Sequence, residues 1–447
     1  MPRRALRHFS GHGLLQVLLR GATGSAGAFA AGAVLALLAQ LVLARLLDVA
    51  HYGHYVYAFT WTIIIAELAR LGFQNSLVRF TAGYRTEGAA APLRGIVRRA
   101  TQIVLAASVA LACVVIAVIA VLAPGLPPAL VWTFVVAALT IPPVALLGVT
   151  QGVLQGYRQA ARAVLPYRAL LHGGILVFAL LAAATVGLDS GAAAMGVTLI
   201  AAVAVLALAM VWVRGAVPAD VRATPPVFHT GYWLRISLPM LLMAGMHILM
   251  KHTDTVMLGL LAGTDEAGLY FPAARMAVLA SLGLMSANAI VAPMIAELHT
   301  RDDRVGLQRL LTLAALGTSA VTLAAVIVFA LAGHWALGLF GEAFRAAWPA
   351  LMILVAGQMV NAVCGPVGLL LTMTGHQDRA ALVLGGGALL NIALNAALIP
   401  PFGLIGAAIA TATATAVWNL WMLLEVRRRH GLNPTVFTHW RRALAGD

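Results

Sequence analysis

Long, uninterrupted apolar stretches recur along nearly the whole chain, and they restrict the folds that it can adopt. Each stretch has about 20 residues, the length that a helix needs to cross the hydrocarbon core of a bilayer. Backbone groups in lipid must find hydrogen bonds within the protein, which a helix provides within each segment. A transmembrane β-barrel is excluded, because its strands would alternate apolar and polar residues over about ten positions.

Twelve such stretches predict an all-α integral membrane protein with twelve transmembrane helices. The composition agrees: 62% of the residues are hydrophobic and 10% are charged, against about 45–50% and about 25% in soluble domains. Cys113 and Cys364 both lie inside apolar stretches, so we predict neither a disulfide framework nor a metal site. The predicted spans are residues 21–44, 54–80, 101–123, 130–150, 164–186, 192–213, 236–262, 269–296, 308–332, 349–372, 380–400 and 404–426.

The basic segment 1–20 precedes the first predicted span. The apolar run that follows continues past Leu43, which is too long for the core of a cleaved signal peptide. We therefore expect an uncleaved first span after an amphipathic cytoplasmic lead-in. The apolar side chains of the lead-in would lie on the membrane surface, and its arginines would face anionic lipid. These apolar residues are Phe9, Leu14, Leu15 and Leu18.

The basic residues are distributed unevenly between the predicted loops. The chain has 29 Lys and Arg residues and 15 Asp and Glu residues. Arg45 and Arg345 fall in loops on one side and Arg70, Lys251 and Arg275 fall within spans, whereas all the others fall on the opposite side. This asymmetry is the positive-inside pattern, so both termini are predicted to be cytoplasmic. The excess of arginine therefore reflects topology, and nucleic acid is not an expected partner.

Short sequences in the first half of the chain recur in the same order in the second half. This order predicts two lobes of six spans, residues 1–215 and 216–447, joined by a polar linker at about 214–235. Because six is an even number, both lobes begin on the same side of the membrane. They are therefore predicted to be related by a pseudo-twofold axis along the membrane normal. Chance likeness between spans rich in Gly and Ala is the alternative. The pairs are Gly53-His54-Tyr55 with Gly268-Leu269-Tyr270, Gln155-Gly156-Tyr157-Arg158 with Thr374-Gly375-His376-Gln377, and Gly187-Leu188 with Gly403-Leu404.

Five charged residues lie inside predicted spans. Glu67 and Arg70 are three residues apart, as are Lys251 and Asp254, so each pair shares a helix face and can form an ion pair. Arg275 has no acidic residue three or four positions away in its span. A charge at the bilayer centre costs about 2.5–3.5 kcal/mol on insertion scales. We interpret these residues as lining a polar cavity between the lobes; ion pairs buried for packing alone are the alternative.

Several motifs occur in order along nearly the whole chain. They are Arg45-Leu46-Leu47 with Gly53-His54-Tyr55, Ser237-Leu238-Pro239 with Asp254, Gly268-Leu269-Tyr270 with Ala274-Arg275, Leu339-Phe340-Gly341-Glu342, and Gly403-Leu404 with Gly406-Ala407-Ala408. Taken together, they resemble the oligosaccharide flippase branch (O-antigen and exopolysaccharide type) of the multidrug/oligosaccharidyl-lipid/polysaccharide exporter superfamily. The resemblance implies a twelve-helix, two-lobed fold that moves an undecaprenyl-pyrophosphate-linked oligosaccharide to the outer leaflet of the bacterial cytoplasmic (inner) membrane by alternating access. The family often has Gly where Asp48 stands.

The resemblance suggests roles for the charged residues within the spans. Arg70, Lys251 and Arg275 are candidates for binding the pyrophosphate, for which the arginine side chain offers a bidentate fork. Glu67 and Asp254 are candidates for coupling, through protonation or sodium binding. The expected energy source is a proton or sodium gradient or the membrane potential, with no cofactor. The expected partners are the bilayer, the lipid-linked oligosaccharide, a polysaccharide polymerase and glycosyltransferases.

Asparagines in the spans have two interpretations. They can contact sugar hydroxyls, or they can form hydrogen bonds between helices, and we favour the second. The residues concerned are Asn288, Asn361, Asn391 and Asn395.

Two other functional classes remain as alternatives. Efflux of drugs or cations on the same architecture would favour acidic cavities without compensating bases, and three bases lie within the spans of this chain. A membrane enzyme such as a glycan polymerase needs catalytic groups in sizeable outer loops. The most polar outer loop holds only Glu342 and Arg345, with His334 nearby, so we do not expect an enzyme.

Overall fold

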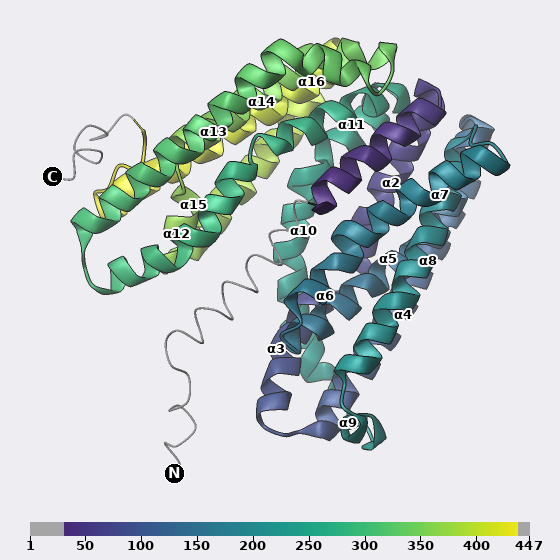
Figure 1. Cartoon of the computed structure of the whole chain (residues 1–447), viewed down its shortest axis with the longest axis horizontal. Helices are drawn as coiled ribbons and strands as arrows, with labels where there is room; N and C mark the ends of the chain where they lie inside the picture. The colour runs from purple at the N-terminus through teal and green to yellow at the C-terminus, as the bar shows by residue number, and fades with distance from the viewer. Residues whose placement is uncertain (1–30, 437–447) are drawn as a thin grey trace. The chain divides into compact units, whose positions relative to one another are not determined.

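The structure, a computed structural model, describes residues 31–436, apart from some side chains within 242–249 and 282–290. The predicted lead-in (1–20) and the beginning of the first predicted span lie outside the described residues. The described chain is built from helices joined by short connections (Figure 1). Its internal contacts define two compact units, Met1–His247 and Ile248–Asp447. This boundary falls within helix α10 (Thr230–Leu261), and the division into residues 1–215 and 216–447 stays a prediction.

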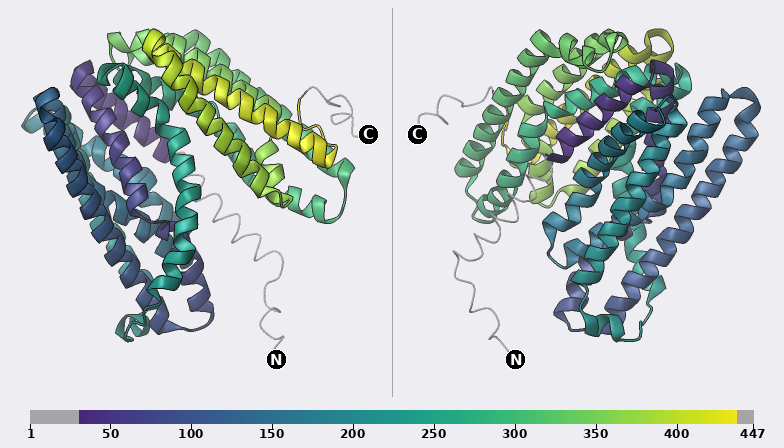
Figure 2. Two further views of the ribbon diagram at one scale, coloured as in Figure 1. Left: turned by 180° about the vertical axis from the view of Figure 1, so that it is seen from behind. Right: turned by 45° about the vertical axis from the view of Figure 1, so that its right-hand side comes forward.

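Unit 1 is organised around helix α5 (Pro128–Gly156), most of which is buried and which contacts α2, α3, α4 and α8. Helices α4, α5, α7 and α8 run side by side in both figures (Figures 1 and 2). Unit 1 also contains the first part of α10, a 3-10 turn at Ala123–Gly125 and a π-helical turn at Pro166–Leu170. The other helices are Ala31–Leu46, α2 (Val49–Ala69), α3 (Phe73–Thr86), α4 (Ala90–Leu122), α6 (Ala160–Leu165), α7 (Leu171–Thr185), α8 (Gly191–Ala216) and α9 (Ala219–Ala223).

Glycines spaced four residues apart let α5 approach its neighbours closely. Gly148, Gly152 and Gly156 lie on one face of the helix. A Cβ atom at Gly148 would lie 2.4 Å from Nε of Arg70, and one at Gly152 would lie 2.5 Å from the backbone oxygen of Gln74. Small residues at this spacing are typical of close helix packing in membranes. This face therefore positions α5 against the end of α2 and the start of α3.

The predicted second span is not one straight helix. Helices α2 and α3 meet at a bend of 41°, where Leu71 and Gly72 both have positive φ (50° and 77°). A Cβ atom at Gly72 would lie 2.0 Å from the backbone oxygen of Ser237, at the start of α10. The Oγ atoms of Ser76 and Ser237 are also 2.6 Å apart. The bend therefore allows the first half of α10 to pack directly on α3 within unit 1.

Unit 2 contains the end of α10 and the remaining helices. Helix α14 packs against α11, α13 and α16, and α13, α14 and α16 run side by side (Figure 1). Apolar side chains from α12, α13, α15 and α16 form a buried cluster that includes Ile295, Leu311 and Val383. The helices are α11 (Thr264–Leu279), α12 (Leu282–Thr300), α13 (Arg304–Gly338), α14 (Trp348–Cys364), α15 (Val367–Met373) and α16 (Gln377–His430), with a 3-10 turn at Glu342–Ala347.

Helix α16 contains two of the predicted spans, 380–400 and 404–426, joined at a kink. Gly403 has φ 53° and ψ −132° there, a conformation suited to glycine. The carboxylate of Glu266, in the first turn of α11, accepts a hydrogen bond from the backbone N–H of Leu404 at 2.9 Å. Glu266 thus satisfies a backbone donor where the helix resumes.

The described helices include several that can cross a membrane. Within residues 31–436, seven are long and apolar enough, and an eighth is counted if the bent pair α2–α3 forms one span. Two predicted spans are broken into shorter helices: 269–296 into α11 and α12, and 349–372 into α14 and α15. The chain is therefore a multi-pass helical membrane protein, while the twelve-span, two-lobe layout stays a prediction.

Candidate functional site

A buried ion pair lies at the end of α2 in unit 1. Arg70 is 3% exposed, and its Nη1 atom donates to Oε2 of Glu67 at 2.5 Å. The same Nη1 donates to Oε1 of Gln74 at 2.8 Å. From α5, the backbone oxygens of Val144 and Ala145 accept hydrogen bonds from Nη2 (2.9 Å) and Nε (3.3 Å). The predicted pairing of Glu67 with Arg70 is therefore confirmed.

Arg70 thus donates four hydrogen bonds, and an arginine side chain has five N–H donors. The guanidinium also lies 5.2 Å from the ring centre of Tyr167, and Gly148 leaves the space that it occupies. Arg70 thus joins the bend between α2 and α3 to the central helix of unit 1. Its predicted role in binding substrate and the predicted coupling role of Glu67 both stay predictions.

A second buried acidic group, Asp254 on α10, lies in unit 2. Its residue is 7% exposed, and three neutral side chains donate hydrogen bonds to the carboxylate. Thr411 donates to Oδ2 at 2.6 Å, Tyr270 donates to Oδ2 at 2.9 Å, and Asn395 donates to Oδ1 at 3.2 Å. The donors come from α11 and from both sides of the kink in α16. Asp254 therefore holds together helices far apart in the sequence.

Asparagine side chains extend this network. Asn391 donates to Oγ1 of Thr411 at 3.1 Å, and Asn395 donates to Oδ1 of Asn391 at 3.1 Å. The predicted interhelical hydrogen bonds are confirmed for Asn395, which reaches Asp254 on α10. The Oδ1 atom of Asn395 is buried and has no hydrogen-bond partner among the described residues. The network thus contains an acceptor oxygen beside the carboxylate.

The sequence interpretation missed two members of this network. Tyr270 appeared only as the end of the repeated Gly268-Leu269-Tyr270 motif, and Thr411 was not singled out at all. A single polar residue within a membrane helix gives no local sign of a buried partner on another helix. The motif was the available signal for Tyr270, and no comparable signal marks Thr411.

The network surrounds the carboxylate of Asp254, and the groups that it can bind depend on the charge of that carboxylate. Among the described residues, the hydrogen-bond partners of Asp254 are uncharged, and it forms no ion pair. An ionised carboxylate is costly to bury without a compensating charge. Carboxylate, hydroxyl and amide oxygens are also the ligands that hard cations prefer. The arrangement is therefore suited to holding a proton or a small cation.

The remaining predicted residues lie on α10 and α11 in unit 2. Lys251, one turn before Asp254, is exposed. Arg275 is half-buried, and its guanidinium carbon lies 4.5 Å from the ring centre of Phe271, one turn earlier on α11. The predicted binding of substrate by Lys251 and Arg275, and a chamber that they share with Arg70, stay predictions.

Comparison with solved structures shows which known proteins have this fold. A multidrug resistance MATE family transporter of the MOP superfamily, in an inward-facing conformation, gives a TM-score of 0.74 at 15% identity; the match covers 89% of this chain and 94% of the transporter. The lipid II flippase MurJ, in an inward closed conformation, gives 0.66 at 13% identity and covers 90% and 87%. At these identities the likeness establishes the fold alone.

Sequence comparison identifies the family. The chain is 29% identical to a probable flippase, AglR, of Haloferax volcanii over 161 residues. That alignment covers 35% of this chain and 34% of the relative, so it spans about a third of either protein. The family of polysaccharide biosynthesis proteins matches residues 18–299, which is more than half of the sequence. The chain therefore belongs to the polysaccharide biosynthesis protein family.

Proposed function

We propose that the chain is a flippase that moves undecaprenyl-pyrophosphate-linked oligosaccharide from the inner to the outer leaflet of the bacterial cytoplasmic membrane. The family match over residues 18–299 carries this proposal. Similarity to a probable flippase and a fold shared with a lipid II flippase support it. The proposal includes a twelve-helix, two-lobed arrangement, alternating access and a role in surface polysaccharide biosynthesis. It also includes the absence of catalytic chemistry, because the chain would move its substrate without altering it.

Binding of the substrate is assigned to cationic side chains. Arg275 and Lys251 would contact the pyrophosphate, which is dianionic or more highly charged and requires charge-assisted donors. Arg275 is the stronger candidate, because the residue is half-buried and its guanidinium lies beside the ring of Phe271. Fewer water molecules would compete for it there than for an exposed side chain. Arg70 is already hydrogen-bonded within unit 1, so its contribution would come mainly from its positive charge.

Coupling is assigned first to Asp254. The carboxylate is buried among neutral hydrogen-bond donors, which supports binding of a proton or a sodium ion there. Its partners lie on α11 and on both sides of Gly403, so a change in the occupancy of the site would alter the contacts of α10 with three other helical segments. Glu67 is the second candidate, and its ion pair with Arg70 gives it a structural role as well.

Export in cells tests the substrate and its binding residues. A strain lacking this gene would be complemented with the wild type, Arg275→Ala, Arg275→Lys or Lys251→Ala, and surface polysaccharide and membrane insertion would be measured. We expect Arg275→Ala and Lys251→Ala to reduce export by at least about tenfold, the effect of losing one charge-assisted hydrogen bond. Arg275→Lys should retain part of the activity, because it keeps the charge but loses the fork.

The matched control is Arg214→Ala, at an exposed position in the last turn of α8. It should export normally. Normal export by inserted Arg275→Ala and Lys251→Ala would remove both residues from the proposed site. If deletion of the gene leaves surface polysaccharide intact but increases drug susceptibility, the chain is an efflux transporter, and the flippase proposal is wrong.

The coupling ion can be identified with purified protein in liposomes. Transbilayer movement of a fluorescent undecaprenyl-pyrophosphate sugar would be measured with a proton gradient, a sodium gradient or neither, for the wild type, Asp254→Asn and Glu67→Gln. We expect one gradient to accelerate the wild type and to have no effect on Asp254→Asn. Glu67→Gln should still respond to the gradient. Equal acceleration of the wild type and Asp254→Asn would exclude Asp254 as the coupling site.

A further inference from the structure

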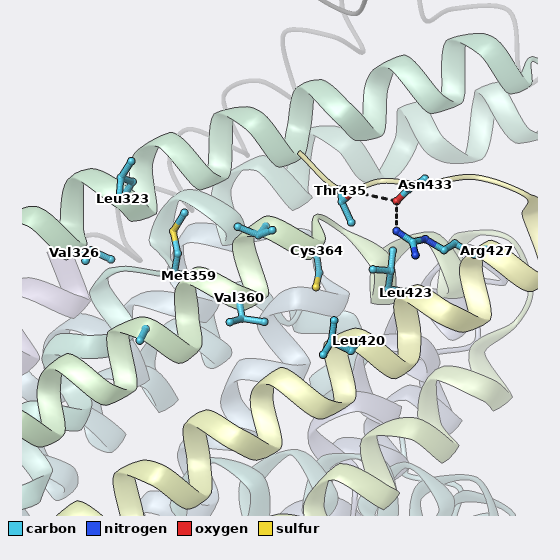
Figure 3. A pocket seen from close by; sticks show the side chains of 12 residues that line it. Leu323, Val326, Met359, Val360, Cys364, Leu420, Leu423, Arg427, Asn433 and Thr435 are labelled. Carbon is cyan, nitrogen blue, oxygen red and sulfur yellow. Dashed lines mark hydrogen bonds between the residues drawn. The ribbon is translucent and has the colours of Figure 1, made fainter. Parts of the chain in front are cut away.

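An apolar cavity of about 600 Å³ lies in unit 2, away from Asp254 and Arg275. Its volume is within the range of pockets that bind small molecules, about 300–1,000 Å³. The walls come from α13, α14 and α16 (Figure 3). Nine of the lining residues are apolar, and several of them are exposed or half-buried at the protein surface. The apolar lining residues are Leu323, Val326, Ala356, Met359, Val360, Val363, Cys364, Leu420 and Leu423.

The polar lining residues lie together at one end of the cavity. In Figure 3, Arg427, Asn433 and Thr435 are on one side, and Leu323 and Val326 are at the other. Nη2 of Arg427 donates to Oδ1 of Asn433 at 2.9 Å, and Thr435 donates to the same oxygen at 3.0 Å. Arg427 forms no ion pair with any described residue. The cavity thus has a long apolar part and a single cationic end.

The chain after α16 closes the polar end. We call residues 431–436 the terminal strap. The backbone of Asn433 forms two hydrogen bonds with the side chain of Gln308 on α13. Its carbonyl oxygen accepts from Nε2 at 2.7 Å, and its N–H donates to Oε1 at 2.8 Å. The N–H of Val436 donates to the backbone oxygen of Val363 on α14 at 3.4 Å. The strap therefore fixes Asn433 and, through it, the guanidinium of Arg427.

We propose that this cavity binds one acyl chain of an anionic membrane phospholipid, with the lipid phosphate on Arg427. The cavity lies among helices that are long and apolar enough to cross the bilayer, so its open side would face acyl chains in the membrane. The acyl chain of a phospholipid would match the apolar part of the cavity, and its phosphate would match the end that carries Arg427. An arginine that extends an apolar stem toward the membrane surface is well placed to meet a lipid headgroup.

Charge favours a phospholipid over the end of this chain itself. Residues 437–447 follow the strap, and they carry Arg441 and Arg442 against Asp447. A basic segment would be repelled by Arg427 and by the adjacent Arg428, whereas a phosphate would be attracted; the charge of Arg429 is compensated by its ion pair with Glu425. Binding of the phospholipid does not depend on which substrate the chain transports.

Native mass spectrometry of the full-length protein in mild detergent tests this site. Phosphatidylglycerol and phosphatidylethanolamine with identical acyl chains would be titrated separately against the wild type, Arg427→Gln and Ala356→Phe. We expect the wild type to bind one phosphatidylglycerol at least about tenfold more tightly than phosphatidylethanolamine. Arg427→Gln should lose this preference. Ala356→Phe should weaken the binding of both lipids, because its ring would fill the apolar part.

Matched controls distinguish the site from the general attraction of a basic surface. Arg428→Gln removes an exposed arginine next to Arg427, and Ala324→Phe adds a ring at an exposed position on α13 outside the lining; both should bind lipid like the wild type. Thermal unfolding gives a second readout: phosphatidylglycerol should raise the Tm of the wild type more than that of Arg427→Gln.

Three results would overturn the proposal. The first is equal binding of phosphatidylglycerol by the wild type and by folded Arg427→Gln and Ala356→Phe. The second is lipid binding that appears only after removal of residues 437–447, which would make that segment the occupant. The third is displacement of phosphatidylglycerol by an equal concentration of undecaprenyl phosphate, which would assign the cavity to the carrier lipid.

Discussion

At the residue scale, Asp48 shows how a single side chain fixes a helix end. The flippase family that the sequence resembles often has Gly at this position. In this chain the carboxylate has a specific role. It accepts a hydrogen bond from the backbone N–H of His51 at 2.7 Å and lies 2.9 Å from Nδ1 of the same residue. Asp48 is therefore the N-cap of α2. The backbone hydrogen bond from His51 is the main cause that lowers the pKa of Asp48 below its usual value of 3.8.

Asp48→Ala should destabilise the protein by about 1 kcal/mol, because it leaves a backbone donor of the first turn unsatisfied. Since the pKa of Asp48 is lower in the folded state, its ionised form favours folding. This contribution is present above the unfolded pKa and is lost as the pH falls through the lower, folded pKa. Hydrogen exchange in the first turn of α2, measured at neutral and acidic pH, checks both effects. Asp48→Asn should keep the cap and lose the pH dependence; equal exchange in Asp48→Ala and the wild type would contradict the capping role.

At the element scale, the kink in α16 depends on a glycine and on an acidic side chain from another helix. Gly403 has φ 53°, and Glu266 approaches the backbone where the second half of α16 begins. Gly187, its counterpart in the internal repeat, also has positive φ, at 84°. The recurrence of Gly-Leu in the sequence therefore marks two positions with positive φ, while the duplication itself stays a prediction.

Gly403→Ala should destabilise the protein by about 1–3 kcal/mol, the cost of holding a residue with a Cβ atom in this backbone conformation. The added Cβ atom would also lie 2.9 Å from Oε2 of Glu266. Thermal unfolding in detergent measures the effect. Gly196→Ala in α8 is the control, because no atom lies within 4 Å of its Cβ position and its φ is not positive; it should be neutral or slightly stabilising. Equal Tm values for the two variants would show that Gly403 tolerates a side chain.

At the scale of the whole molecule, the sequence makes a prediction about orientation in the membrane. Arginines cluster in alternate loops, so both termini should be cytoplasmic. A green fluorescent protein fused to the C-terminus should fluoresce, and alkaline phosphatase inserted in the loop at Glu342–Ala347 should be active. Phosphatase inserted after Arg301, on the opposite predicted side, is the matched control and should be inactive. An active enzyme after Arg301 and an inactive one at Glu342–Ala347 would reverse the topology.

The sequence by itself determined the class of fold, because every apolar stretch must satisfy its own backbone hydrogen bonds in lipid. It also determined the Glu67–Arg70 pair, since residues three apart on a helix are neighbours whatever the rest of the chain does. Only the tertiary structure decided the surroundings of Asp254. Its partners Asn395 and Thr411 lie 141 and 157 residues away in the sequence. Contacts at such separations depend on how helices pack, and no local spacing encodes them. The bend at Gly72 and the direct contact of Ser76 with Ser237 were decided in the same way.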